Sequence, residues 1–294
     1  MGKILILGSS GLLGSKLTSG QYLKKYKIIS QSLKSKTHIN VDLEKFNEVK
    51  KMINLTNPKI IINLVALTNV DHCEKFPVEA YNINVNTIKN LVKAIQTSSC
   101  KPYLIHLSTD QVYDGTGNCK EKDISLSNYY SFSKYVAELF ACQLKSIILR
   151  TNFFGKSKSV TRGSLTDWLY SELTKGKTIS VFEDIWFNPI SMHNLCKIIE
   201  IIVEKKCEGI FNLGSHYGMT KASFAFHFAK ALNLPNLNLK PIKVSNVSHL
   251  NAYRPKNMMM NLTKFENKFK VNLPDLIDEI NLVAQEYRDE QKKF

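Results

Sequence analysis

The feature that most constrains the fold is a glycine-rich segment close to the start of the chain. Gly8, Gly11 and Gly14 follow the short apolar run Ile4 to Leu7, and a helical pattern begins within this segment. Dinucleotide-binding turns use glycines at this spacing for a tight bend, for close approach of the backbone to a pyrophosphate, and for close packing of helix on strand. The N–H groups at the helix start then meet the phosphates. The segment therefore predicts a dinucleotide-binding turn, and an ordinary strand-to-helix turn is the alternative.

Strand-like and helical patterns alternate through the first half of the chain. The strand-like runs are Ile4 to Leu7, Ile28-Ile29, Lys59 to Val65, Tyr103 to Leu107 and Ser146 to Leu149. The helical patterns run from Gly11 into the twenties, from Phe46 to Leu55, from Ala80 to Ile95 and from Tyr130 to Leu144. Such alternation predicts βαβ units with right-handed crossovers. We therefore expect an α/β fold with a Rossmann-type, doubly wound parallel sheet.

After about Thr151 the strand-like and helical patterns no longer alternate regularly. Helical patterns occur at 166–175, 192–203, 223–232 and 276–287, strand-like runs at 178–182 and 209–213, and a loop-rich stretch at 233–257. The run at 209–213 is expected to return to the main sheet. We expect an NAD(P)-binding domain of residues 1–152 plus about 184–213, and a smaller, discontinuous C-terminal substrate-binding lobe of about 153–183 and 214–294.

The segment after the second strand bears on the choice of dinucleotide. In sites that prefer NAD, an acidic residue about 20 positions beyond the glycines binds the ribose hydroxyls. Residues 30–36 contain Lys34 and Lys36 and no Asp or Glu. This absence favours NADPH and leaves NADH open, and the alternative is that both lysines are solvated loop charges.

Tyr130 and Lys134 form a Tyr-x-x-x-Lys pair within a predicted helix, so they share one helix face. A tyrosine with a pKa of about 10 is a poor acid at neutral pH, and a nearby ammonium would lower that pKa. Thr109 follows the strand 103–107, at the sheet edge where such folds place ligands, and its hydroxyl could bind a carbonyl oxygen that gains charge. Taken singly, a surface helix and a strand-end turn explain these residues. Together with the glycine turn, in this order, they are far more specific for catalysis.

Several further segments occur in a recognisable order. They are Asn63 to Glu74, Ala80 to Leu91, Ser108 to Gly115, Arg150-Thr151, Asn188-Pro189-Ile190 and Arg254-Pro255. With these segments, nearly the whole chain resembles the extended short-chain dehydrogenase/reductases. It looks most like the dTDP-4-dehydrorhamnose reductase family of nucleotide-sugar reductases.

The resemblance implies a role for individual positions. Tyr130 would protonate the sugar carbonyl oxygen, Lys134 would tune Tyr130 and bind the nicotinamide ribose, and Thr109 would bind the reacting oxygen. The cofactor-binding positions are Gly8, Ser10, Gly11, Leu12, Leu13, Gly14, Asp42, Leu43, Val65, Ala66, Leu67, Asn84, Tyr130 and Lys134. The substrate-binding positions are Thr109, Asp110, Gln111, Val112, Tyr130, Asn152 and Arg254. The Arg254 guanidinium is suited to the substrate diphosphate.

The implied activity is NADPH-dependent reduction of the keto group of a nucleotide-linked 4-keto-6-deoxysugar, for cell-surface polysaccharide synthesis. Gln111 stands where related dehydratases carry a glutamate that moves a proton, and an amide cannot take a proton. The alternatives are an epimerase or dehydratase with tightly bound NAD, and a non-catalytic dinucleotide-binding regulatory subunit of the same fold. Val65 replaces the usual alanine, and the segments around 153–154 and 186–187 differ from the family pattern, which leaves the sugar and the base open.

Composition excludes several other classes of protein. The net charge of +15 comes almost entirely from scattered lysines, with four arginines, so we expect no nucleic-acid partner. No apolar run approaches the roughly 20 residues of a membrane helix, and no secretory signal pattern is present, so a cytoplasmic protein is expected. The six cysteines and seven histidines show no metal-ligand spacing, which predicts reduced thiols and no metal site. A homodimer and a magnesium requirement are both left open.

Overall fold

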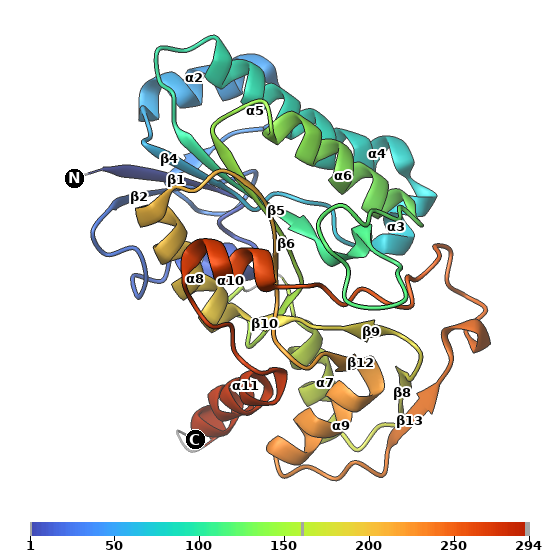
Figure 1. Cartoon of the computed structure of the whole chain (residues 1–294). Helices are drawn as coiled ribbons and strands as arrows, with labels where there is room; N and C mark the ends of the chain where they lie inside the picture. Colours follow the sequence, from blue (N-terminus) through green and yellow to red (C-terminus); the bar gives the residue numbers. More distant parts are fainter. Residues whose placement is uncertain (1, 160–161, 292–294) are drawn as a thin grey trace.

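Seven parallel strands form the central sheet of the computed structural model, which describes residues 2–159 and 162–291. Along the sheet the order is β11-β6-β5-β4-β1-β2-β3 (Figure 1). The strands are β1 (Lys3–Leu7), β2 (Lys27–Ser32), β3 (Ile39–Asn40), β4 (Ile60–Asn63), β5 (Tyr103–Thr109), β6 (Ser146–Thr151) and β11 (Gly209–Leu213). The predicted doubly wound sheet is confirmed, and so is the return of 209–213 to it, because β11 pairs parallel with β6.

The strand order reverses beside β1. From β1 the chain first builds outward through β2 and β3, and then starts again with β4 on the other side of β1. Leu7, the last residue of β1, pairs with Gln31 of β2 and with Asn63 of β4. Doubly wound sheets bind ligands at the carboxyl ends of the strands at such a reversal. The glycine turn therefore begins at the point where the topology opens a crevice.

Helices cover both faces of the sheet because the strand side chains alternate in direction. Ile4 and Ile6 pack on the face with α1 (Leu12–Leu17), α8 (Met192–Lys205) and α10 (Thr263–Phe269). Leu5 and Leu7 pack on the face with α2 (Phe46–Thr56), α5 (Thr87–Gln96) and α6 (Tyr129–Ala141). Both faces are buried, which explains the nearly continuous apolar strands of the sequence.

A separate hydrophobic core lies below the carboxyl end of the sheet in Figure 1. It is built by α7 (Leu165–Thr174), α9 (Lys221–Ala231) and α11 (Leu276–Gln291), and its aromatic centre includes Phe154, Phe187, Phe224 and Phe228. Three two-stranded sheets join distant segments there. They pair β7 (Phe153–Phe154) with β10 (Ile190–Ser191), β8 (Ile179–Phe182) with β13 (Leu239–Ile242), and β9 (Trp186–Phe187) with β12 (Met219–Thr220). We call this part the second lobe; the exact domain boundaries stay a prediction.

Three expected elements differ from the structure. The first helix ends at Leu17 rather than in the twenties. Gly20 follows with a φ of +80°, which lies outside the range of a right-handed helix. The helix expected over 80–95 is divided into α4 (Pro77–Tyr81), a π-helical turn (Asn82–Asn86) and α5, preceded by the short α3 (Val70–Lys75). The loop-rich stretch 233–257 contains β13, which pairing with β8 stabilises despite Pro241. No helix in the described ranges is long and apolar enough to cross a membrane.

Candidate active site

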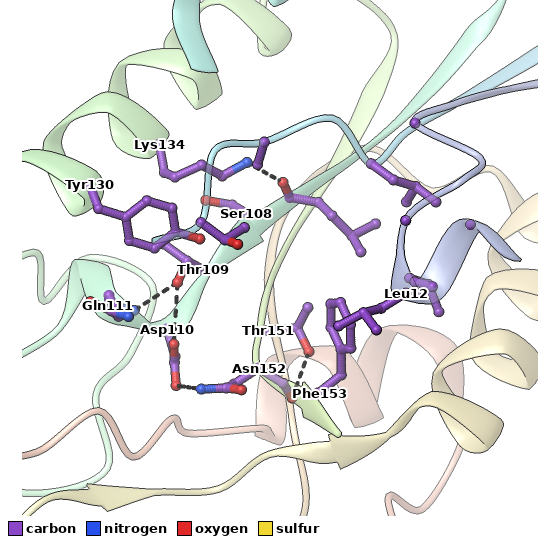
Figure 2. A pocket seen from close by; sticks show the side chains of 18 of the residues that line it. Leu12, Ser108, Thr109, Asp110, Gln111, Tyr130, Lys134, Thr151, Asn152 and Phe153 are labelled. Atoms are coloured by element: carbon purple, nitrogen blue, oxygen red, sulfur yellow. Dashed lines mark hydrogen bonds between the residues drawn. The ribbon is translucent and has the colours of Figure 1, made fainter. Parts of the chain in front are cut away.

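Two adjoining cavities lie along the carboxyl ends of the central strands. The first cavity runs from the glycine turn to the ends of β5 and β6, and Thr109, Tyr130 and Lys134 line it (Figure 2). The second cavity runs from the same turn to the ends of β2 and β3, and Asp42 and Leu43 line it. Gly8 and Gly11 belong to both walls. The structure therefore brings the predicted catalytic residues and the predicted dinucleotide turn into one continuous crevice.

The glycine turn has the geometry that its sequence requires. Gly8 has a φ of +75°, which favours glycine, and its carbonyl accepts a hydrogen bond from the Gly11 N–H at 3.1 Å. A Cβ on Gly14 would lie 2.5 Å from the Gly8 oxygen and 2.6 Å from the Ser9 Cα, so α1 packs directly on the turn. Gln31 at the end of β2 stabilises the turn, because its side-chain oxygen accepts from the Gly8 N–H at 3.2 Å.

The second cavity lacks an acid at the end of β2. Gln31, Ser32 and Leu33 form this part of its wall, and the Gln31 amide donates to the Val41 carbonyl at 2.7 Å. Lys34 and Lys36 lie exposed in the loop that follows. The opposite wall carries Val65, Ala66 and Leu67, as predicted from the resemblance.

A capping box positions Tyr130 in the first turn of α6. The Asn128 side chain accepts from the Ser131 N–H at 2.8 Å, and the Ser131 hydroxyl accepts in return from the Asn128 N–H at 3.3 Å. Asn128 therefore caps the start of α6. Burial raises the pKa of the Tyr130 hydroxyl, while the bond to the Thr109 hydroxyl acts to lower it. The Tyr130 hydroxyl therefore keeps its proton at neutral pH, and Tyr130 shares a wall of the first cavity with Thr109 (Figure 2).

Lys134 lies one helical turn further along α6 and is buried. Its ammonium donates to the Leu107 carbonyl at 2.7 Å. Burial lowers the Lys134 pKa to about 8, and Glu138 acts in the opposite direction. The expected lowering of the Tyr130 pKa by Lys134 is wrong for this arrangement, because the ammonium bonds the strand backbone and burial dominates at the phenol.

A buried ion pair supports this part of α6. The Arg150 Nε donates to Glu138 Oε1 at 2.9 Å and its Nη2 donates to Oε2 at 2.6 Å, and both side chains are almost fully buried. The Ser108 hydroxyl donates to the same carboxylate. Glu138 thus joins α6 to β5 and β6 next to Lys134. Arg150 lies in one of the family-like segments of the sequence, but its partner lies 12 positions away on the neighbouring helix, and no local pattern pairs the two.

Asp110 forms the far end of the first cavity (Figure 2). Its carboxylate accepts from the Asn152 amide at 2.8 Å and from the Thr109 hydroxyl at 3.3 Å. Burial raises the Asp110 pKa to about 6, although these bonds and the charge of Lys221 act to lower it. Gln111 also lines the cavity, and its side-chain oxygen accepts from the Asn128 amide at 3.3 Å.

Three predicted site residues lie outside the cavity walls in the described structure. Val112 is fully buried in the hydrophobic core. Asn84 lies behind the wall, where its side chain accepts from the Leu67 N–H at 2.7 Å and donates to the Ser133 hydroxyl at 2.9 Å. The Arg254 guanidinium bonds the Asp71 carboxylate and the Ala252 carbonyl.

The structure adds residues that sequence reasoning missed. Thr68, Thr151 and Phe153 line the first cavity, and Arg162 lines both cavities. Phe153 lies in β7, in the segment 153–154 that departs from the family pattern, whereas Arg162 lies between β7 and α7, where no sequence pattern marks it.

Comparison with known proteins shows one matching protein family and several related proteins. A family model described as "RmlD substrate binding domain" matches residues 2–289. The chain is 33% identical over 165 residues to a dTDP-4-dehydrorhamnose reductase of Aggregatibacter actinomycetemcomitans, a match that covers 53% of each chain. It is 26% identical over 278 residues to the methionine adenosyltransferase 2 subunit beta of Pongo abelii, covering 90% of this chain and 81% of that protein.

The fold matches solved structures over nearly its full length. The crystal structure of dTDP-4-dehydrorhamnose reductase from Bacillus anthracis in complex with NADP superposes with a TM-score of 0.87 at 23% identity. The match covers 97% of this chain and 99% of that chain. The expected extended short-chain dehydrogenase/reductase fold is thereby confirmed.

Proposed function

The chain belongs to the RmlD substrate binding domain family, and from this premise we propose that it is an oxidoreductase that uses NADPH to reduce the keto group of a nucleotide-linked 4-keto-6-deoxysugar. The observation that carries this proposal is the presence of Tyr130, Thr109 and Lys134 in one cavity that continues along the glycine turn. We place the reaction in cell-surface polysaccharide synthesis, as the resemblance implies.

The described side chains suit a carbonyl reduction. NADPH, when bound, supplies the hydride. The Thr109 and Tyr130 hydroxyls lie where they can both donate to the carbonyl oxygen, and such donors stabilise the negative charge that develops there. Tyr130, kept neutral by burial, transfers its proton to that oxygen. Lys134 is charged below a pH of about 8, and its ammonium lines the same cavity, where it can bind the nicotinamide ribose.

The crevice offers suitable residues for each part of the dinucleotide. The glycine turn would hold the pyrophosphate, Lys134 the nicotinamide ribose, and the second cavity the adenosine end. The end of β2, at Gln31 and Ser32, carries no acid that would repel a 2′-phosphate, and the acids that line this cavity, Asp42 and Glu44, follow β3 instead. The complex of the Bacillus anthracis reductase with NADP supports the same preference.

Gln111 supports reduction rather than dehydration. It lines the first cavity beside Thr109 and Asp110, where a related dehydratase would carry a second carboxylate. An amide cannot accept the proton that dehydration removes.

The test is NADPH oxidation by the purified protein with a panel of dTDP-, UDP- and GDP-linked 4-keto-6-deoxysugars. We expect turnover with at least one of them. Tyr130→Phe should reduce kcat by about 10²-fold or more, because the proton donor is lost, while the Kd of NADPH stays within twofold. Tyr129→Phe is the matched control, since that ring packs against Phe132 and is expected to leave kcat unchanged. Absence of oxidation with the whole panel, or full activity of Tyr130→Phe, would refute the proposal.

A second candidate function is that of a non-catalytic regulatory subunit. The long match to the methionine adenosyltransferase 2 subunit beta favours it. It predicts that the protein binds NADPH, reduces no keto sugar, and raises or lowers the activity of a co-purifying methionine adenosyltransferase. Turnover in the sugar panel that depends on Tyr130 would count against it.

A further inference from the structure

We propose that Arg162 binds the pyrophosphate of the dinucleotide, so that the second half of the chain supplies a cation to a site otherwise built on the central sheet. The inference rests on the proposed function only in requiring a dinucleotide in the crevice. It does not depend on which sugar is reduced, or on whether one is.

The two cavities meet at the glycine turn, and Arg162 lines both of them together with Gly8 and Gly11. A dinucleotide that spans both cavities must place its pyrophosphate at this junction, because that group joins its two halves. Arg162 therefore lines the crevice at the place where the pyrophosphate would meet the backbone N–H groups of the turn.

The described walls of the two cavities carry few basic side chains. Among the described residues that line the second cavity, Arg162 is the one basic side chain, and Asp42 and Glu44 line the same cavity. In the first cavity the other basic residue is Lys134, whose ammonium bonds the Leu107 carbonyl. The turn itself offers only partial charges, whereas a pyrophosphate carries full negative charges. A guanidinium matches phosphate oxygens in charge and in planar, bidentate geometry.

Hydrogen bonds hold the segment around Arg162 against the turn. The Ser159 hydroxyl donates to the Ser10 carbonyl of the glycine turn at 2.9 Å. The Ser157 hydroxyl donates to the Arg162 carbonyl at 2.7 Å. These two serines connect the backbone at Arg162 to the turn on which the phosphates would rest.

The same segment is anchored to the second lobe at its other end. Asp167, in the capping box of α7, accepts from the Ser157 N–H at 3.2 Å and from the Ser164 N–H at 2.7 Å. Its other oxygen accepts from the Tyr287 hydroxyl of α11 at 2.6 Å.

The Arg162 side chain itself is exposed, so a ligand can reach it without displacing packed groups.

The experiment compares the binding of NADPH and NADH, without any sugar, by the wild type, Arg162→Gln and Arg162→Lys in fluorescence or calorimetric titrations. Both dinucleotides contain the pyrophosphate. We therefore expect Arg162→Gln to raise both Kd values about tenfold or more, and Arg162→Lys to recover part of the loss. Lys158→Gln is the matched control in the same segment, because its ammonium bonds Gln21 outside both cavities, and its Kd values should stay within twofold.

Two results would overturn the inference. Kd values of Arg162→Gln within twofold of the wild type would show that the guanidinium does not bind the cofactor. Weaker binding of NADPH with unchanged binding of NADH would assign Arg162 to the 2′-phosphate instead. A protein that loses dinucleotide affinity in Arg162→Gln but reduces no keto sugar would keep this inference and lose the proposed function.

Discussion

The two sides of the crevice position their residues in different ways. On the side of the central sheet, Gly8 directly follows β1, Thr109 ends β5, and Tyr130 and Lys134 share one face of α6. The residues compared with them are Arg162, which lines both cavities, and Arg254, which lines neither. Asp71 holds Arg254, 183 positions away in the sequence, and Ser10 holds the Arg162 segment through Ser159, 149 positions away. Local structure thus positions the residues to which we assign the chemistry, whereas long-range contacts position Arg162 and Arg254, to which we assign the charged groups of the ligands.

The largest expected effect concerns the buried ion pair between Glu138 and Arg150. It tests whether α6, which carries Tyr130 and Lys134, also depends on a contact with another element. Glu138→Ala leaves the Arg150 guanidinium buried without its carboxylate, and we expect the free energy of unfolding to fall by about 3–5 kcal/mol. Urea unfolding at pH 7 measures it. Glu204→Ala removes an exposed partner of Lys25, 3.2 Å away, and should cost less than about 1 kcal/mol. Equal losses in both variants would mean that the buried pair does not support α6.

The second prediction concerns the local packing of the glycine turn. An alanine at position 14 must push α1 away from the Gly8 oxygen and the Ser9 Cα, so Gly14→Ala should raise the Kd of NADPH at least about tenfold. Gly117→Ala is the matched control, because a Cβ there meets no heavy atom within 4 Å. If Gly14→Ala binds NADPH as tightly as Gly117→Ala, close packing of helix on strand is not needed at this turn.

The smallest expected effect concerns Arg254, which is held by a long-range contact with Asp71. Burial acts to raise the Asp71 pKa, but Arg254 and the N–H groups of Asn251 and Ala252 lower it overall, so Asp71 is ionised at neutral pH. Asp71→Asn removes the charge that holds Arg254, and we expect the KM of the keto sugar to rise about three- to tenfold, with the Kd of NADPH unchanged. Steady-state kinetics and a NADPH titration separate the two. Glu79→Gln, which alters an exposed bond to His72, is the control. A loss of NADPH affinity in Asp71→Asn would contradict the prediction, because it would show that the contact between Asp71 and Arg254 also affects cofactor binding.

Some site residues could be read only in part from the sequence. The Tyr-x-x-x-Lys spacing predicts a shared helix face, and α6 confirms it. The same spacing could not show that the Lys134 ammonium bonds the Leu107 carbonyl, because that contact depends on how α6 packs on β5. Likewise the helical periodicity of 80–95 gave no sign of the π-helical turn, in which Asn84 bonds Leu67 and Ser133.

The sequence by itself determined the alternating α/β order, the glycine turn and the strand-end position of Thr109, because each depends on a short run of residues whose backbone preferences and polarity are local. Only the tertiary structure decided that Glu138 neutralises Arg150, that Asp71 holds Arg254 and that Arg162 reaches the glycine turn. Those contacts join segments that only the closing of the fold brings together, and no periodicity in a single segment encodes its distant partner.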